Sequence, residues 1–255
     1  MAYKIILDPG HGGSDPGATF NGRQEKDDAL ALAMAVGQLL TNAGFDVEYT
    51  RTTDVYNTPF EKAMIGNNAG GDLFVSFHRN SSAVPNMYNG VQTLVYNDEG
   101  FKAELARNIN KNLVALGFED KGVVERPNLV VLKRTKMPAV LIEAGFINSD
   151  IDNELYDTKF DEIAQGIADA IIDTVNDWGL TATNSQSYNI QVGAFRNSQL
   201  ANSMAAQLRA QGFPVTVVLE DGLYKVQVGD FESLDNAVAM EQRLRSMGYN
   251  TFIRS

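Results

Sequence analysis

Short apolar runs alternate with segments of helical period along the first two thirds of the chain, and this alternation is the strongest constraint on its fold. The runs lie at residues 5–7, 47–50, 73–77, 91–96 and 140–142, and each is typical of a buried β-strand. Helical period predicts one helix at about residues 25–42, which stops at Gly44, and another at about residues 159–178. The alternation indicates an α/β domain with a mixed, twisted sheet flanked by helices.

A second domain is indicated by an internal repeat. Residues 188–195, YNIQVGAF, recur as residues 224–231, YKVQVGDF, and the same offset relates the positions that follow. Each half has the pattern strand, helix, strand, so we expect a small βαββαβ, ferredoxin-like α+β domain with a four-stranded antiparallel sheet backed by two helices. Residues 179–187 are small, polar and aperiodic, as in flexible linkers. The predicted organisation is therefore a domain at 1–178, a linker at 179–187 and a domain at 188–255.

Composition narrows the possible functions. The 255 residues contain no cysteine, so disulfides and thiolate metal sites are excluded and any metal must be held by His and carboxylate. The formal charge is -11, and an acidic chain is repelled by polyphosphate, which disfavours nucleic acid and anionic membranes as partners. The sequence has no membrane-length apolar run and no signal-peptide pattern. We expect synthesis in the cytoplasm, and if the protein acts outside the cell, we expect lysis or another non-classical route to release it.

The two histidines, His11 and His78, are both expected on loops that directly follow strands, where α/β sheets place their sites. Zinc favours imidazole and carboxylate ligands and keeps an open position in catalytic sites, so a third protein ligand is required. Glu25 is the candidate, because it heads the helical stripe that faces the core. Asp27 and Asp28 lie off this stripe, and we expect them only to interact favourably with the helix dipole. The glycine-rich run around His11 lacks the Gly-Lys-Ser/Thr ending of a phosphate-binding loop.

Glu143 ends the buried apolar run at residues 140–142, where burying an acid lowers the stability of the fold unless the acid has a function. Over a metal-bound water it could take a proton during attack and return it to a leaving amine. Desolvation would raise the pKa of this carboxyl toward neutrality. We therefore predict that Glu143 acts as general base and general acid.

Four segments resemble the zinc-dependent N-acetylmuramoyl-L-alanine amidases of autolysins and endolysins: DPGHGGSDPGA from Asp8, QEK from Gln24, SFHRNS from Ser76 and PAVLIEAGF from Pro138. The resemblance covers roughly residues 3–176. It implies that His11, Glu25 and His78 bind Zn²⁺, that Glu143 is catalytic, and that the chain cleaves the amide between N-acetylmuramic acid and L-alanine of the peptidoglycan stem peptide.

Other positions of the catalytic domain match the family only in part. Lys62 replaces a frequent family arginine, and Gly66-Asn67 replaces the usual Ala-Asn. Arg51 and Arg126 also match family positions, but a surface or structural ion pair is at least as good an expectation for each. We therefore leave these residues out of the predicted catalytic set.

The C-terminal repeat resembles SPOR domains, which bind peptidoglycan glycan strands that have lost their peptides. An RNA-binding domain of the same topology is the alternative for this segment. It lacks the aromatic signature motifs of such domains, and residues 185–255 carry six basic and six acidic side chains, so they are formally neutral. We therefore expect the C-terminal domain to bind glycan strands.

Other functions remain open at the level of sequence. The same metal site could serve a zinc carboxypeptidase or a deacetylase on cell-wall substrates. The chain could also be a non-catalytic wall-binding regulator, although such a protein would be expected to lose a ligand or the glutamate. The sequence does not distinguish a bacterial sporulation autolysin from a phage endolysin.

Overall fold

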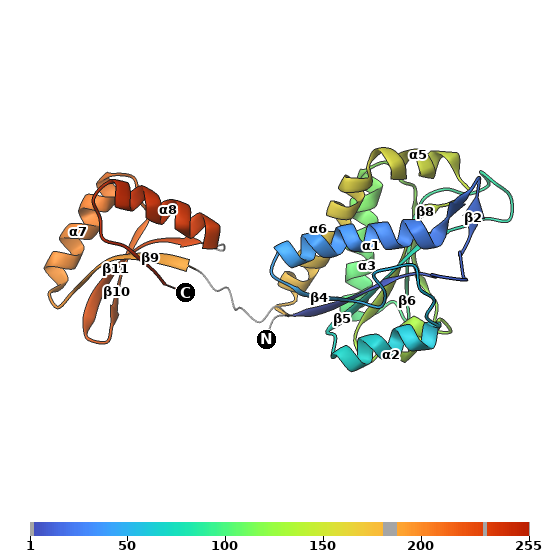
Figure 1. Ribbon diagram of the computed structural model, residues 1–255, viewed down its shortest axis with the longest axis horizontal. Helices are drawn as coiled ribbons and strands as arrows, with labels where there is room; N and C mark the ends of the chain where they lie inside the picture. Colours follow the sequence, from blue (N-terminus) through green and yellow to red (C-terminus); the bar gives the residue numbers. More distant parts are fainter. Residues whose placement is uncertain (1–2, 181–187, 232–233, 255) are drawn as a thin grey trace. The chain divides into compact units, whose positions relative to one another are not determined.

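The computed structural model describes residues 3–180, 188–231 and 234–254. Internal contacts divide the chain into two compact units, Met1–Ala182 and Thr183–Ser255, which we describe separately (Figure 1). The predicted linker at 179–187 lies largely outside the described residues. Among the described helices, none combines the length and the apolar character required to cross a bilayer.

The N-terminal unit contains a six-stranded mixed sheet in the order β4-β1-β5-β8-β6-β7. Four neighbouring strands, β4, β1, β5 and β8, are parallel, whereas β6 is antiparallel to β8 and parallel to β7. The strands are β1 (Lys4–Pro9), β4 (Asp46–Tyr49), β5 (Leu73–Asn80), β6 (Val91–Val95), β7 (Asp120–Glu125) and β8 (Ala139–Phe146). The predicted mixed α/β sheet is confirmed, and β7 is a strand that the apolar pattern did not reveal.

Helices cover both faces of this sheet because its strands are apolar on both sides (Figure 1). Ile5 and Leu7 of β1 belong to the larger core, whereas Ile6 packs with Phe74 in a second core on the opposite face. The larger core includes α1 (Glu25–Asn42), α3 (Gly100–Ala115) and α6 (Phe160–Asp177), and the second lies under α2 (Pro59–Ala69) and α4 (Val130–Arg134). The remaining elements are α5 (Asp150–Thr158) and the hairpin of β2 (Thr19–Phe20) and β3 (Arg23–Gln24), which leads into α1.

The strands that carry the predicted site residues are neighbours at the centre of the sheet. β1, β5 and β8 run parallel, so their carboxyl ends meet at one edge. His11 follows β1, but His78 and Glu143 lie within β5 and β8 rather than after them. The expectation that His78 and Glu143 end their strands was therefore wrong, because the β5–β8 ladder continues past them to Asn80 and Phe146.

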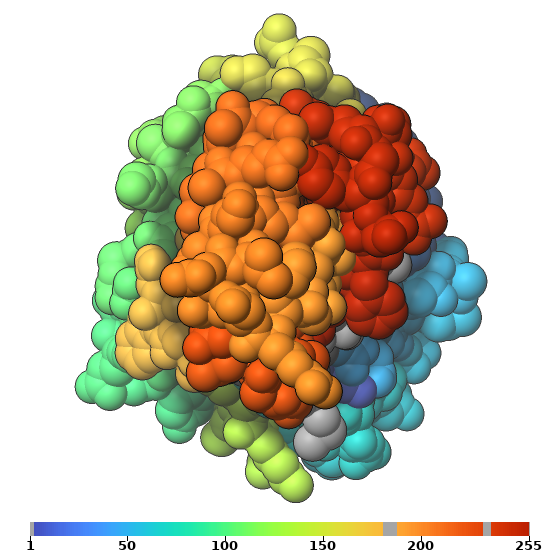
Figure 2. Space-filling model, turned by 90° about the vertical axis from the view of Figure 1, so that its left-hand side faces the viewer, coloured from blue at the N-terminus to red at the C-terminus, as the bar shows by residue number. Residues whose placement is uncertain are grey.

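The C-terminal unit is the predicted βαββαβ domain, with an antiparallel sheet in the order β10-β11-β9-β12. The two helices pack on the same face of this sheet, against Ile190, Val192 and Val226, and Figure 2 shows the surface of this unit with α7 in orange and α8 in red. The elements are β9 (Tyr188–Phe195), α7 (Ser198–Ala210), β10 (Val215–Glu220), β11 (Leu223–Phe231), α8 (Leu234–Ser246) and β12 (Phe252–Arg254).

Candidate metal centre

His11 is held in a strained loop directly after β1. Its φ is +56°, an uncommon value for a residue with a side chain, and Gly12 and Gly13 also have positive φ. The ring Nδ1 lies 2.8 Å from the Asp15 carboxylate. If Nδ1 carries the proton that this carboxylate accepts, Nε2 is left with a free lone pair. Nε2 lies 3.1 Å from Oε1 of Glu25, so the loop presents this nitrogen to the helix that follows.

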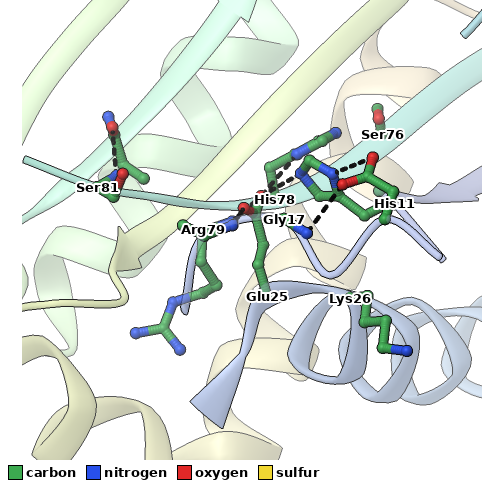
Figure 3. Close-up of polar contacts among 12 residues, drawn as sticks. His11, Gly17, Glu25, Lys26, Ser76, His78, Arg79 and Ser81 are labelled. Carbon is green, nitrogen blue, oxygen red and sulfur yellow. Dashed lines mark hydrogen bonds and ion pairs between the residues drawn. The ribbon is translucent and has the colours of Figure 1, made fainter. Parts of the chain in front are cut away.

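Glu25 is the first residue of α1 (Figure 3), and its side chain is buried among the described residues. Oε1 lies 2.8 Å from Nδ1 of His78 and accepts the backbone N–H of Arg79, while Oε2 accepts the N–H of Ala18. Burial raises the pKa of this carboxyl, but the two imidazoles outweigh burial and hold the pKa well below its ordinary value. The carboxylate is therefore ionised, as a metal ligand must be.

His78 packs against the glycine loop. The two imidazole rings lie 4.9 Å apart between centroids at an interplanar angle of 76°. Burial lowers the pKa of His11, but the carboxylates of Glu25 and Asp15 outweigh burial and raise it. The two rings and one carboxylate thus form a compact group that is electrostatically complementary without a metal.

These three residues satisfy the requirements of a divalent metal site. One ligand atom from each of His11, Glu25 and His78 lies within 4.8 Å of the others. Ligands about 2.0–2.1 Å from a tetrahedral zinc lie about 3.3 Å apart, close to the 3.1 and 2.8 Å between Oε1 of Glu25 and the imidazole nitrogens. Two nitrogens and one oxygen leave a coordination position open, so the group fits a catalytic metal site.

Glu143 lies beside His78, its register partner on the neighbouring parallel strand. Its Oε2 atom is buried and has no hydrogen-bond partner among the described residues. Burial raises the pKa of this carboxyl to about 7. A buried carboxyl with an unpartnered oxygen and a near-neutral pKa can exchange a proton with a water or substrate molecule bound beside it.

A cavity of about 250 Å³ opens beside the two imidazoles. The rest of its wall comes from Leu141 of β8, the strand of Glu143, and from the loop before α2, the first turn of α2 and the start of α4. The segments around α2 and α4 were not in the predicted site, because they meet the other residues only through the fold. Besides His11, His78, Asp8 and Asp15, the lining residues are Asn57, Pro59, Lys62, Asn128, Leu129, Val130, Val131 and Leu141.

Two basic residues noted in the sequence support the loop that carries His11. Arg51 is buried and donates to the carbonyl oxygens of Pro9 and Gly10, among others, so it holds backbone rather than forming the expected ion pair. Lys62 donates to the Pro9 carbonyl and lies 3.1 Å from Asp8. Both cations therefore bind the loop and its flanking strand.

The other expectations have mixed outcomes. Arg126 donates to the backbone carbonyl of its neighbour, Glu125, and lies outside this group of residues. Asp27 is exposed, as expected for an acid that only favours the helix dipole. The same expectation for Asp28 was wrong, because its carboxylate accepts from both Arg23 and Arg79 at 2.6 Å.

Gly10 determines how closely the loop approaches His78. A Cβ atom at this position would lie 2.5 Å from Cε1 of His78 and 2.7 Å from the carbonyl oxygen of Phe77. We expect Gly10→Ala to displace the imidazole and to weaken metal affinity roughly 10–100-fold, the effect typical of disturbing the support of a ligand. Metal titration of the purified variant measures this effect. Gly166→Ala in α6, where the added atom meets only Cβ of Asn112 at an ordinary 3.5 Å, is the control, and wild-type affinity in Gly10→Ala would contradict the prediction.

Comparison with known proteins matches each part of the chain to a family. A family described as N-acetylmuramoyl-L-alanine amidase matches residues 5–173, and one described as SPOR domain matches residues 184–255. A sporulation-specific N-acetylmuramoyl-L-alanine amidase from Bacillus subtilis (strain 168) is 38% identical over 86% of this chain and 85% of its own length. An endolysin from Bacillus phage SPP1 is 34% identical over 69% of this chain and 67% of its own length.

Solved structures agree with these sequence matches. The crystal structure of an N-acetylmuramoyl-L-alanine amidase from Clostridium difficile 630 has 32% identity and a TM-score of 0.65 with this chain. The match covers 69% of this chain and 97% of that structure.

Proposed function

This chain belongs to the N-acetylmuramoyl-L-alanine amidase family, and from that premise we propose that it hydrolyses peptidoglycan with zinc held by His11, Glu25 and His78 and with Glu143 as the proton carrier. The bond cleaved is the amide between N-acetylmuramic acid and L-alanine of the stem peptide. The observation that carries the proposal is the convergence of three ligand atoms beside the orphaned, buried oxygen of Glu143.

Zinc in such a site supplies Lewis acidity, which activates water and polarises the scissile carbonyl. Oε2 of Glu143 takes a proton from the attacking water and returns it to the alanine nitrogen as the C–N bond breaks. The products are a free lactyl carboxylate on the sugar and a stem peptide with a new alanine amino terminus. The pKa of about 7 suits both halves of this transfer, because a group near the working pH can accept and donate.

The chain's own groups prepare this chemistry before substrate arrives. Asp15 holds the His11 ring, and the N–H groups of Ala18 and Arg79 fix the Glu25 carboxylate. The adjacent cavity, with apolar walls and the amides of Asn57 and Asn128, gives the substrate space beside the imidazoles. Preorganised support of this kind lowers the reorganisation that the reaction requires.

Mass spectrometry of wall digests tests the proposed bond. An amidase releases intact stem peptides with an alanine amino terminus, whereas a carboxypeptidase releases single amino acids and a deacetylase releases acetate. Metal analysis of the same preparation should find one zinc per chain. Stoichiometric zinc without free stem peptides would refute the assigned bond, and activity that survives full chelation would refute the metal.

The C-terminal unit is a SPOR domain, a wall-binding module for glycan strands. We propose that the sheet face opposite its helices is the binding surface. Register pairs align Thr216, Gln227, Gln191 and Phe252 in one row across all four strands, and these side chains alternate with the core residues. Phe252 is 65% exposed. An exposed ring and a row of amides can stack on sugar faces and bond to hydroxyls.

We expect the double variant Gln191→Ala, Gln227→Ala to weaken binding to peptide-free glycan strands about tenfold or more, since each lost hydrogen bond contributes roughly 1 kcal/mol. Co-sedimentation with peptide-stripped wall glycan measures the affinity. Gln207→Ala, on the exposed surface of α7, is the matched control. Equal loss in Gln207→Ala, or no loss in the double variant, would place the binding surface elsewhere.

A further inference from the structure

Arg79 is a buried arginine that directly follows the metal-ligand candidate His78 in β5. Its side chain is about 1% exposed, and burying a guanidinium is costly unless its donors are satisfied. The proposed chemistry leaves this side chain without a role. Its contacts extend to α1 and β8, the elements that carry Glu25 and Glu143.

The guanidinium bonds in several directions at once. Nη1 donates to Oδ2 of Asp28 at 2.6 Å, and Nη2 donates to Oδ1 of Asn153 at 2.8 Å. Longer contacts reach the carbonyl oxygens of Gly145 and Phe146 at 3.4 and 3.5 Å. The cation is therefore shared between α1, α5 and the end of β8.

Asp28 and Tyr156 extend the same group of contacts. Asp28 also accepts from Nε of Arg23, and the hydroxyl of Tyr156 donates to the backbone carbonyl of Asp28. Arg79 and Arg23 both lie over the Tyr156 ring, at 4.0 and 5.0 Å from its centroid. Two cations, one carboxylate and one ring thus fix the first turn of α1 against α5.

The anchoring points on α1 and β8 lie close in sequence to residues of the site. Asp28 lies one helical turn after Glu25, and the carbonyl of Gly145 lies two residues after Glu143. The backbone N–H of Arg79 donates to Oε1 of Glu25 itself (Figure 3). One side chain therefore links the strand of His78, the helix of Glu25 and the strand of Glu143.

We propose that Arg79, through its ion pair with Asp28 and its bonds to the end of β8, is a positioning residue that sets the spacing of Glu25, His78 and Glu143 for metal binding and turnover. The inference rests on the proposed function, because it takes these three residues to be the metal ligands and proton carrier. Replacing a buried ion pair by packed apolar groups is often neutral for stability. Stability alone therefore does not explain a buried cation here, whereas positioning the residues of the site does.

The test compares Arg79→Met, Arg79→Lys and Asp28→Asn with the wild-type full chain. Zn²⁺ affinity is measured by competition with a chromophoric chelator at 25 °C, and the visible spectrum of the Co²⁺-substituted proteins reports coordination geometry. We expect Arg79→Met and Asp28→Asn to weaken Zn²⁺ affinity roughly 10–100-fold and to change the Co²⁺ spectrum. Arg79→Lys keeps the pairing with Asp28 but loses the forked donors, so it should recover part of the affinity.

Lys159→Met is the matched control, because Lys159 also donates from a partly buried position to a backbone carbonyl, that of Leu116, away from the metal candidates. It should lower the Tm of the metal-free protein without changing Zn²⁺ affinity. If Arg79→Met does not fold, the isosteric Asp28→Asn decides the question. Variants that are folded, with wild-type affinity and spectrum, would overturn the positioning role. A wild-type chain that binds no Zn²⁺ would instead refute the proposed metal site.

Discussion

Glu143→Gln is expected to lower the turnover of peptidoglycan about 10²–10⁴-fold, the contribution typical of a positioned general base. The variant should keep its zinc, because Glu143 is not among the three residues whose ligand atoms converge. Glutamine preserves the shape of the side chain but cannot accept and return the proton. Release of stem peptides, followed by mass spectrometry alongside metal analysis, measures both properties in one preparation.

The pH dependence of stability provides an independent readout of the same carboxyl. Burial raises the pKa of Glu143 to about 7, above the ordinary 4.5. The stability that this raised pKa provides is present below pH 4.5 and is lost as pH rises through about 7. The difference between the two pKa values corresponds to about 3 kcal/mol of folding free energy between low and high pH.

Glutamine does not titrate, so metal-free Glu143→Gln should gain stability relative to the wild type as pH rises from 5 to 8. Urea denaturation of the chelated proteins measures this difference. A constant difference across that range would show that the carboxyl is not desolvated. Near-full activity of Glu143→Gln would show that another group carries the proton.

The parts of the fold that follow from local pattern were predictable. The stripe that begins at Glu25 predicts a helix over 25–42, and the structure gives α1 these same bounds because the apolar period and the following Gly44 act locally. The apolar runs gave the central strands for the same reason. β7 carries glycine and charged residues and is only partly buried, so its sequence lacks the strand pattern.

The contacts of the site were less accessible to sequence reasoning. Asp28 has the spacing of a surface acid on α1, but it pairs with Arg23 of β3, just before the helix, and with Arg79, which the fold of β5 brings to the same place. Likewise, Asn57 and Asn128 share a cavity although 70 residues separate them in the chain. A local motif can indicate a ligand, but it cannot show which distant side chains support that ligand.

Glu25→Ala is expected to abolish stoichiometric zinc binding and to reduce amidase activity to background. The carboxylate oxygen Oε1 lies within 3.1 Å of both imidazole nitrogens, so its removal eliminates the atom that connects the two rings. Losing a ligand should weaken zinc affinity by more than the roughly 10–100-fold that is typical when a residue supporting a ligand is lost. Zinc content after dialysis and the release of stem peptides measure the effect.

Asp27→Ala is the matched control, because Asp27 is an exposed acid in the same first turn of α1. The Asp27→Ala variant should retain zinc and activity, since the lost charge affects only the interaction with the helix dipole, a contribution of about 0.3–1 kcal/mol.

The pKa of the Glu25 carboxyl is lowered, so the ionised carboxylate adds stability above pH 4.5 that is lost as pH falls through the folded pKa. Metal-free Glu25→Ala should therefore lose less stability than the wild type below pH 4.5. Full zinc content and activity in Glu25→Ala would mean that the metal is held elsewhere, and the assignment of His11 and His78 would fail with it.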